Sequence, residues 1–168
     1  KRMVGKNDIS KTSFANIQAK RITKEMVANV KEVDSAMIEL RKVTDESENA
    51  YDKFLSGASE KSKQLHTNLS EVVNATADFA RIGYDIDKAS VLAEAAIIYS
   101  NVGDEIDSMD DASNSLISSM KAFKGFEADP MAIVDKFNEV SNNFAISSGG
   151  IGEALQRSAS SFATAGNT

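Results

Sequence analysis

The amino-acid sequence predicts an all-α protein, with a long amphipathic helix near its start and a compact bundle of about six shorter helices after it. Three observations lead to this fold class. Pro130 is the only proline among 168 residues, apolar residues recur three or four positions apart along most of the chain, and no segment shows the two-residue alternation of a strand. The apolar share of 42% is sufficient for the core of one domain.

Residues 14–43 are predicted to form one long helix with a heptad pattern. Six apolar residues follow one another at steps of three or four: Ile22, Met26, Val30, Val33, Met37 and Leu40. This is the period of a left-handed coiled coil, so the pattern predicts self-association through these side chains. Three heptads are a short run, and the alternative is an amphipathic helix that lies on its own domain.

The charge distribution and the helix pattern together suggest three segments: a basic arm over 1–13, the long helix over 14–46 and a helical core module over 47–168. Residues 1–24 carry seven Lys or Arg against one acid, whereas residues 85–111 carry eight acids against one lysine. The net charge of −6 argues against a nucleic-acid-binding chain, and no sequence-specific nucleic-acid contact is expected.

Capping residues and a glycine mark the next two helices. Thr44 or Ser47 can cap a helix that runs to about Leu65. Asn68 and the glutamate three residues later have the spacing of a capping box, and Gly83 suits the left-handed position that ends a helix. The residues expected to face the core here are Tyr51, Phe54, Leu55, Ala58, Val72, Val73, Ala75, Phe79 and Ile82.

Asp85 restarts the helical pattern, and residues 87–102 are apolar on most of the helix circumference. A helix of this kind is usually buried on several sides, so we expect it to be the central helix of the bundle. Gly103 ends it.

Three more helix starts follow, namely Asp107 or Ser108, Asp129 directly before Pro130, and Ser147 or Ser148. The first of these helices should close at Gly125. The residues predicted to face inward are Ala112, Leu116, Ile117, Met120, Phe123, Ile133, Val134, Phe137, Val140, Phe144, Ile151, Leu155, Ala159 and Phe162.

No residue pattern predicts a catalytic, cofactor-binding or metal site, and we expect a protein that is not an enzyme. His66 is the only histidine, cysteine is absent, and the acids over 104–111 lack the spacing of a calcium loop. Those acids suit the first turn of the following helix. The glycines at 149, 150 and 152 lack the spacing of a phosphate-binding loop, so a flexible helix start is the preferred interpretation.

Several segments, in this order, resemble the core region of phage tail tape-measure proteins. The segments are Val30–Thr44, Ala80–Tyr84, Ile98–Val102, Ala112–Phe123, Phe137–Phe144 and Ile151–Ala159. The similarity extends from about Val30 to Gly166, and it depends on the order and spacing of the segments rather than on any catalytic motif. Residues 1–20 match no family that we can name.

The resemblance implies a structural virion protein that sets tail length and assists tail assembly and DNA ejection. The implied partners are the tail tube protein, tail assembly chaperones and baseplate or tail-tip proteins, with contact to the host envelope on ejection. The implied location is the tail lumen, after assembly in the host cytoplasm.

A second hypothesis is a helical adaptor or toxin-like bundle that binds a protein partner or a membrane surface through its arm and first helix. The acids Glu25, Glu32, Asp34 and Glu39 make an anionic membrane less attractive to that helix.

Overall fold

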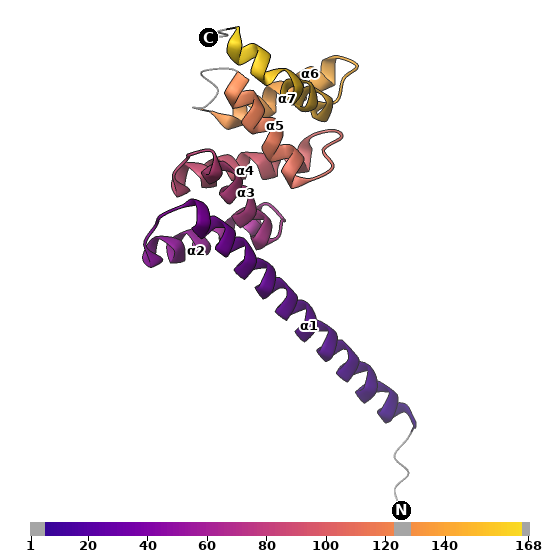
Figure 1. The fold of residues 1–168 in the computed structure, drawn as a ribbon. Coiled ribbons are helices and arrows are strands. Elements are labelled where there is room, and N and C mark those ends of the chain that lie inside the picture. Colours follow the sequence, from indigo (N-terminus) through magenta and orange to yellow (C-terminus); the bar gives the residue numbers. More distant parts are fainter. Residues whose placement is uncertain (1–5, 123–128, 166–168) are drawn as a thin grey trace, which may run out of the picture.

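The computed structural model describes residues 6–122 and 129–165, which form seven helices and no strand (Figure 1). The helices are α1 (Lys6–Val43), α2 (Glu48–Gln64), α3 (Leu69–Arg81), α4 (Ile86–Val102), α5 (Met109–Ala122), α6 (Pro130–Asn143) and α7 (Ser148–Thr164). The predicted all-α fold, with a long first helix and six shorter ones, is confirmed. Helix α1 begins at Lys6 rather than residue 14, because no glycine or proline interrupts the chain between Lys6 and Val43.

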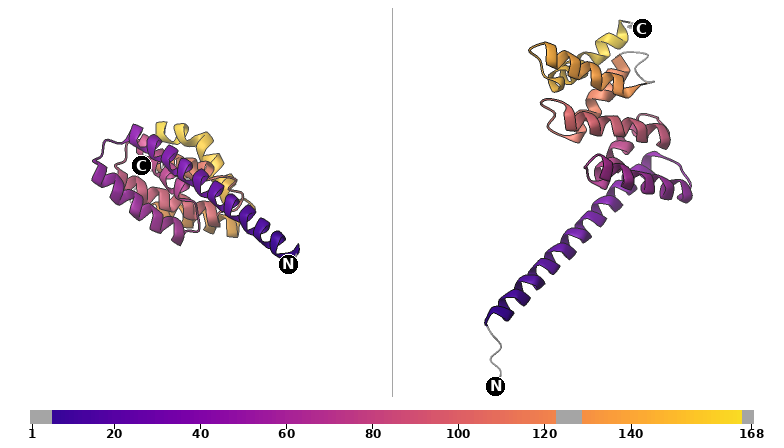
Figure 2. Two further views of the ribbon diagram at one scale, coloured as in Figure 1. Left: turned by 90° about the horizontal axis from the view of Figure 1, so that it is seen from below. Right: turned by 180° about the vertical axis from the view of Figure 1, so that it is seen from behind.

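The shorter helices are stacked in the order of the sequence (Figures 1 and 2). Within the described residues, each helix packs mainly against helices one or two positions away along the chain, and a hydrogen bond from Tyr99 to Ser148 joins α4 to α7. Helices α1, α3, α5 and α7 follow one another in one row, and α2, α4 and α6 follow one another in a second row. Such nearest-neighbour packing is the arrangement of a helical solenoid, in which the stability of each unit depends on the units beside it.

Helix α4 occupies the centre of this stack, as predicted. It packs against α2, α3, α5 and α6, and eight of its residues are buried: Ile86, Ala89, Leu92, Ala93, Ala95, Ala96, Ile97 and Tyr99. The small alanines allow the neighbouring helices to approach closely. Val91 and Val102 are nevertheless more than half exposed, so the apolar circumference of α4 is not fully covered.

Most of the predicted helix boundaries are confirmed by their capping hydrogen bonds. The backbone N–H of Ala50 donates to Ser47 Oγ at 3.2 Å, that of Lys88 to Asp85 Oδ1 at 2.8 Å, and that of Ala132 to Asp129 Oδ1 at 3.2 Å. Ser108 and Ser147 cap α5 and α7 in the same way. The Asn68 capping box is formed, and Gly83 has a φ of +102°, in the region that favours glycine.

Three residues predicted to face the core are more than a third exposed, and all three lie at helix ends. Ile82 and Val140 are each 37% exposed, and Phe144 is 68% exposed. Ile82 and Phe144 follow the last residues of α3 and α6, and Val140 lies in the last turn of α6. The apolar spacing continues to the ends of these helices, but these side chains are exposed there, so these predictions were wrong. Phe123, Gly125 and the side chains of Ala159 and Phe162 lie outside the described part of the chain.

The turn after α4 is held against the start of α7. The buried Tyr99 hydroxyl donates a hydrogen bond to the carbonyl oxygen of Ser148 at 2.6 Å, and the N–H of Asp104 donates to Ser148 Oγ at 2.7 Å. The N–H of Gly149 donates to the carbonyl oxygen of Asp104 at 2.9 Å. Burial raises the pKa of Tyr99 well above its ordinary value, so its hydroxyl remains a donor even at a pH where an exposed tyrosine would ionise.

Close packing, rather than flexibility, explains the glycines at the start of α7. A Cβ atom added to Gly149 would overlap the carbonyl oxygen of Glu105, and one added to Gly152 would overlap the Ser115 side chain. Both glycines are helical. The expected flexible helix start is therefore wrong. Glycine is required at these two positions because α7 lies too close to the α4–α5 turn and to α5 to leave space for a side chain.

Gly149→Ala should destabilise the stack, because the added methyl group would overlap the backbone of Asp104 and Glu105. The three hydrogen bonds described above hold this turn against the start of α7 and prevent it from moving away. We expect a loss of about 2 kcal/mol or more in the free energy of unfolding, measured by urea denaturation and circular dichroism. Gly57 is the matched control: it lies within α2, and an added Cβ meets nothing within 4 Å. Gly57→Ala should raise stability by about 0.5–1 kcal/mol. Equal effects of the two substitutions would contradict the close approach at Gly149.

Candidate interaction surface

The first part of α1 projects away from the helical stack (Figures 1 and 2). Four apolar side chains on it are more than half exposed: Ile22 (55%), Met26 (64%), Val27 (51%) and Val30 (60%). Large apolar side chains at successive helical turns are costly to leave in water, and such exposed patches mark interaction surfaces. We call these four residues the open seam.

The second part of the heptad pattern is covered by the chain itself. Met37 is 9% exposed and Leu40 is fully buried, and both belong to the main hydrophobic core together with Val73 of α3. Val33 is half-buried at the boundary. The six residues predicted for self-association are thus divided, and Met37 and Leu40 are already occupied by an intramolecular contact. The interpretation of an amphipathic helix that lies on its own domain holds for the covered half of α1, and self-association through the open half stays a prediction.

Helix α3 runs along α1 in the same direction. The start of α3 lies beside Val30 and Val33, where Leu69 lines the same groove. Toward the other end of both helices, Arg81 of α3 lies 3.5 Å from Glu39 of α1. Helix α3 therefore covers part of the heptad face of α1, and the two helices point in the same direction.

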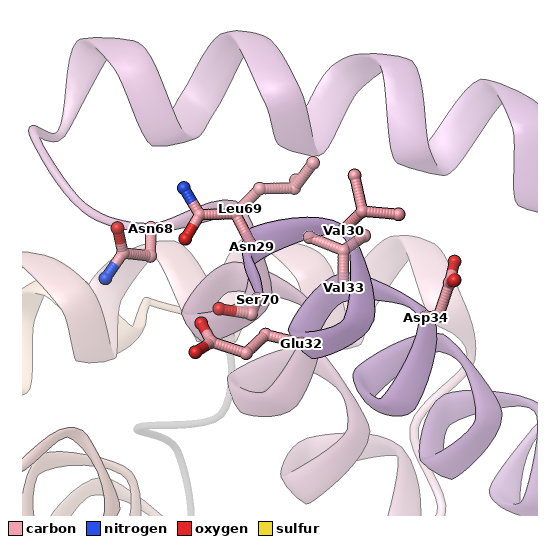
Figure 3. A pocket seen from close by; sticks show the side chains of 8 residues that line it. All are labelled: Asn29, Val30, Glu32, Val33, Asp34, Asn68, Leu69 and Ser70. Carbon is pink, nitrogen blue, oxygen red and sulfur yellow. The ribbon is translucent and has the colours of Figure 1, made fainter. Parts of the chain in front are cut away.

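A groove of about 320 Å³ lies where the covered part of α1 begins, and Figure 3 shows its lining residues. Val30, Val33 and Leu69 supply its apolar wall, and polar side chains surround it: Asn29, Glu32, Asp34, Asn68 and Ser70. We call it the fork groove. It is continuous with the open seam through Val30, which belongs to both.

Ion pairs join α1 to its surroundings on the covered half. The hydrogen bond from Lys42, assisted by the charges of Lys42 and Arg81, lowers the pKa of Glu39 below its ordinary value. Arg41 makes a bidentate ion pair with Glu48 and lies over the Tyr51 ring at 4.3 Å. These pairs are solvent-exposed, so each contributes little stability, and the buried apolar residues determine how α1 is attached.

The residues considered for catalysis have structural positions. His66 is exposed in the turn between α2 and α3, with a φ of +55°. Asp110 and Asp111 lie in the first turn of α5, where the helix dipole favours acids, as predicted. In the residues that the structure describes, no three His, Cys, Asp or Glu side chains are grouped as metal ligands.

Sequence reasoning missed that acids far apart in the chain surround one cavity. Glu105, Asp107, Asp111 and Glu153 line a hollow of about 500 Å³ between the α4–α5 turn, α5 and α7. In the sequence, the only signal that α7 approaches the α4–α5 turn and α5 was the pair of glycines at 149 and 152. In addition, none of the described helices has the length and apolar character needed to cross a membrane.

A family model described as phage-related minor tail protein matches residues 56–168. The chain belongs to this family. No solved structure matches it. The matched residues extend from within α2 to the C-terminal end, so they include α3 to α7, whereas α1 lies upstream of them. Membership gives this tail protein a structural role in a phage tail, in agreement with the resemblance found in its sequence.

The division of the seam predicts different effects for two substitutions on the same helix. Leu40→Ala should lower the free energy of unfolding by about 2–5 kcal/mol, because it leaves a cavity in the core. Met26→Ala should change the stability of the monomer by less than about 0.5 kcal/mol, because Met26 is exposed. Urea unfolding at low protein concentration measures both. Similar losses for the two variants would mean that α1 lies against the stack along its whole length.

Proposed function

We propose that this tail protein is a tape measure, whose helical length sets the length of the phage tail and which assists tail assembly and DNA ejection. The observation that carries the proposal is α1, an uninterrupted helix of 38 residues whose first part projects from the stack. At about 1.5 Å per residue, it is about 57 Å long. A rod of fixed rise per residue converts chain length into distance, as a ruler requires.

Two different parts of the chain support two parts of this role. Helix α1 is the rod, and the stack of α2 to α7 is the docking module at one end of it. The stack is built from short helices in close contact, so it offers a folded surface rather than additional length. Family membership and the sequence segments that resemble tape-measure proteins support a structural function.

The proposed partners follow from this role. Copies of the chain associate through the open seam, and the tail tube protein surrounds them in the tail lumen. Assembly chaperones cover the chain in the host cytoplasm before the tube closes. The stack contacts baseplate or tail-tip proteins, and the chain reaches the host envelope on ejection.

Tail length should change in proportion to the length of α1. In phage carrying the full gene, residues 8–21 would be deleted, or duplicated once or twice, because whole heptads keep the open seam in phase. Each step changes the rod by 14 residues, so mean tail length should change by about 21 Å per step, at about 1.5 Å per residue. Electron microscopy of many tails measures the slope.

A length-preserving control separates distance from composition. Residues 8–21 would be replaced by another 14-residue helical sequence with the same apolar spacing, and tails should keep their normal length. Normal mean length across the whole deletion and duplication series, with tails still assembled, would rule out α1 as part of the ruler.

A further inference from the structure

The heptad face of α1 has two different surroundings along its length. From Val33 onward it is covered by α3, which runs parallel to α1 and buries Met37 and Leu40. Before Val33 it is open, and apolar residues continue at Val30 (position a) and Met26 (position d), whereas the preceding position a is Thr23. The heptad face of α1 is therefore covered by α3 of the same chain from the level of Leu69 onward.

The open seam has the features of a surface that pairs with a second copy of itself. With Val30 at heptad position a, Ile22 and Asn29 occupy position g, and Val27 and Asp34 occupy position e. In a parallel pair in register, each g residue of one helix faces the e residue five positions later in the other. Ile22 then faces Val27 of the second copy, apolar against apolar. Asn29 faces Asp34 of the second copy, and an amide can donate to a carboxylate.

The start of α3 limits how far such a pair can extend. A second α1 that continued along the seam would meet Asn68 and Leu69, and beyond them Met37 and Leu40 are already buried. The second copy carries its own α3 at the same level. Two paired helices must consequently diverge at this point, and the fork groove is the apolar space left at the divergence.

We propose that the open seam pairs in parallel and in register with α1 of a second copy, and that this pairing ends at the fork groove, where α3 of each chain replaces the second copy. The inference deepens the association of copies included in the proposed function and rests on it. The assembly is forked: paired rods at one end, and separate helical stacks at the other. Each stack keeps its surface available for other tail proteins.

Single cysteines test the register and the end of the pairing, because the natural chain contains none. Met26→Cys and Val30→Cys place the thiol at positions that face their own counterparts in a parallel in-register pair. Both variants should form disulfide-linked dimers under mild oxidation. Met37→Cys and Leu40→Cys occupy the same two heptad positions beyond the fork groove, where α3 buries them, and neither should form dimers.

The outcomes separate the fork from association in general. Dimers from Met26→Cys and Val30→Cys alone support the proposal. Dimers from the positions beyond the groove as well would overturn the fork and leave the association of copies intact. Dimers from none of the four variants would overturn both, whereas the tail-length series tests the ruler independently.

A matched pair of substitutions tests the seam in the unmodified chain. Val30→Asp would place a carboxylate inside the pair and should weaken dimerisation at least tenfold, or about 1.4 kcal/mol, in sedimentation experiments over a range of concentrations. Ile38→Asp is the control, because Ile38 is similarly exposed at 55% but lies outside the seam. It should leave the dimerisation constant unchanged. Equal weakening by both substitutions would overturn the proposal.

Discussion

The packing of α1 against α3 joins the projecting helix to the rest of the molecule. Leu40 is fully buried and Met37 nearly so, and they share a core with Val73. Burying side chains of this size stabilises by about 1.5–3 kcal/mol each, more than the exposed ion pairs beside them. The direction of the rod relative to the stack therefore depends on a few apolar residues at one end of α1. Farther toward the start of that helix, Ile22, Met26, Val27 and Val30 are more than half exposed.

The stack beyond α3 depends on contacts between helices that are close in the sequence. Each helix packs against those one or two positions away, so every unit is stabilised chiefly by its neighbours. The few longer-range contacts are specific. Tyr99 donates a hydrogen bond to Ser148, 49 residues later, and Gly149 lies against the backbone of the α4–α5 turn. These contacts connect α7 to α4 and to the α4–α5 turn, across the two rows of helices.

The arrangement suits a structural protein of a phage tail. The proposed length and docking roles require helices, helix caps and apolar faces. These features explain the positions of most of the residues discussed above. Its acids stabilise helix starts, as Asp110 and Asp111 do for α5, or surround the hollow beside α7. In the proposed tape-measure role, the projecting part of α1 supplies length and the stack of shorter helices supplies a docking surface.

The sequence by itself determined the helices, because the signals for them are local. Asp129 before Pro130, the Asn68 capping box and Gly83 each act within a few residues of their own position, so all three could be predicted. The all-round apolar character of α4 likewise indicated a central helix. The resemblance to tape-measure proteins led to the tail family for the same reason, since it depends on the order of local segments.

Only the tertiary structure decided which apolar faces are covered. The heptad pattern is the same from Met26 to Leu40, yet α3 buries one half of it and leaves the other half in water. Phe144 has the spacing of a core residue but follows the last residue of α6, where no neighbour covers it. Gly149 resembled a flexible start until the α4–α5 turn was found against it. Periodicity states which side chains share a face, whereas the position of another helix decides whether that face is a core or an open surface.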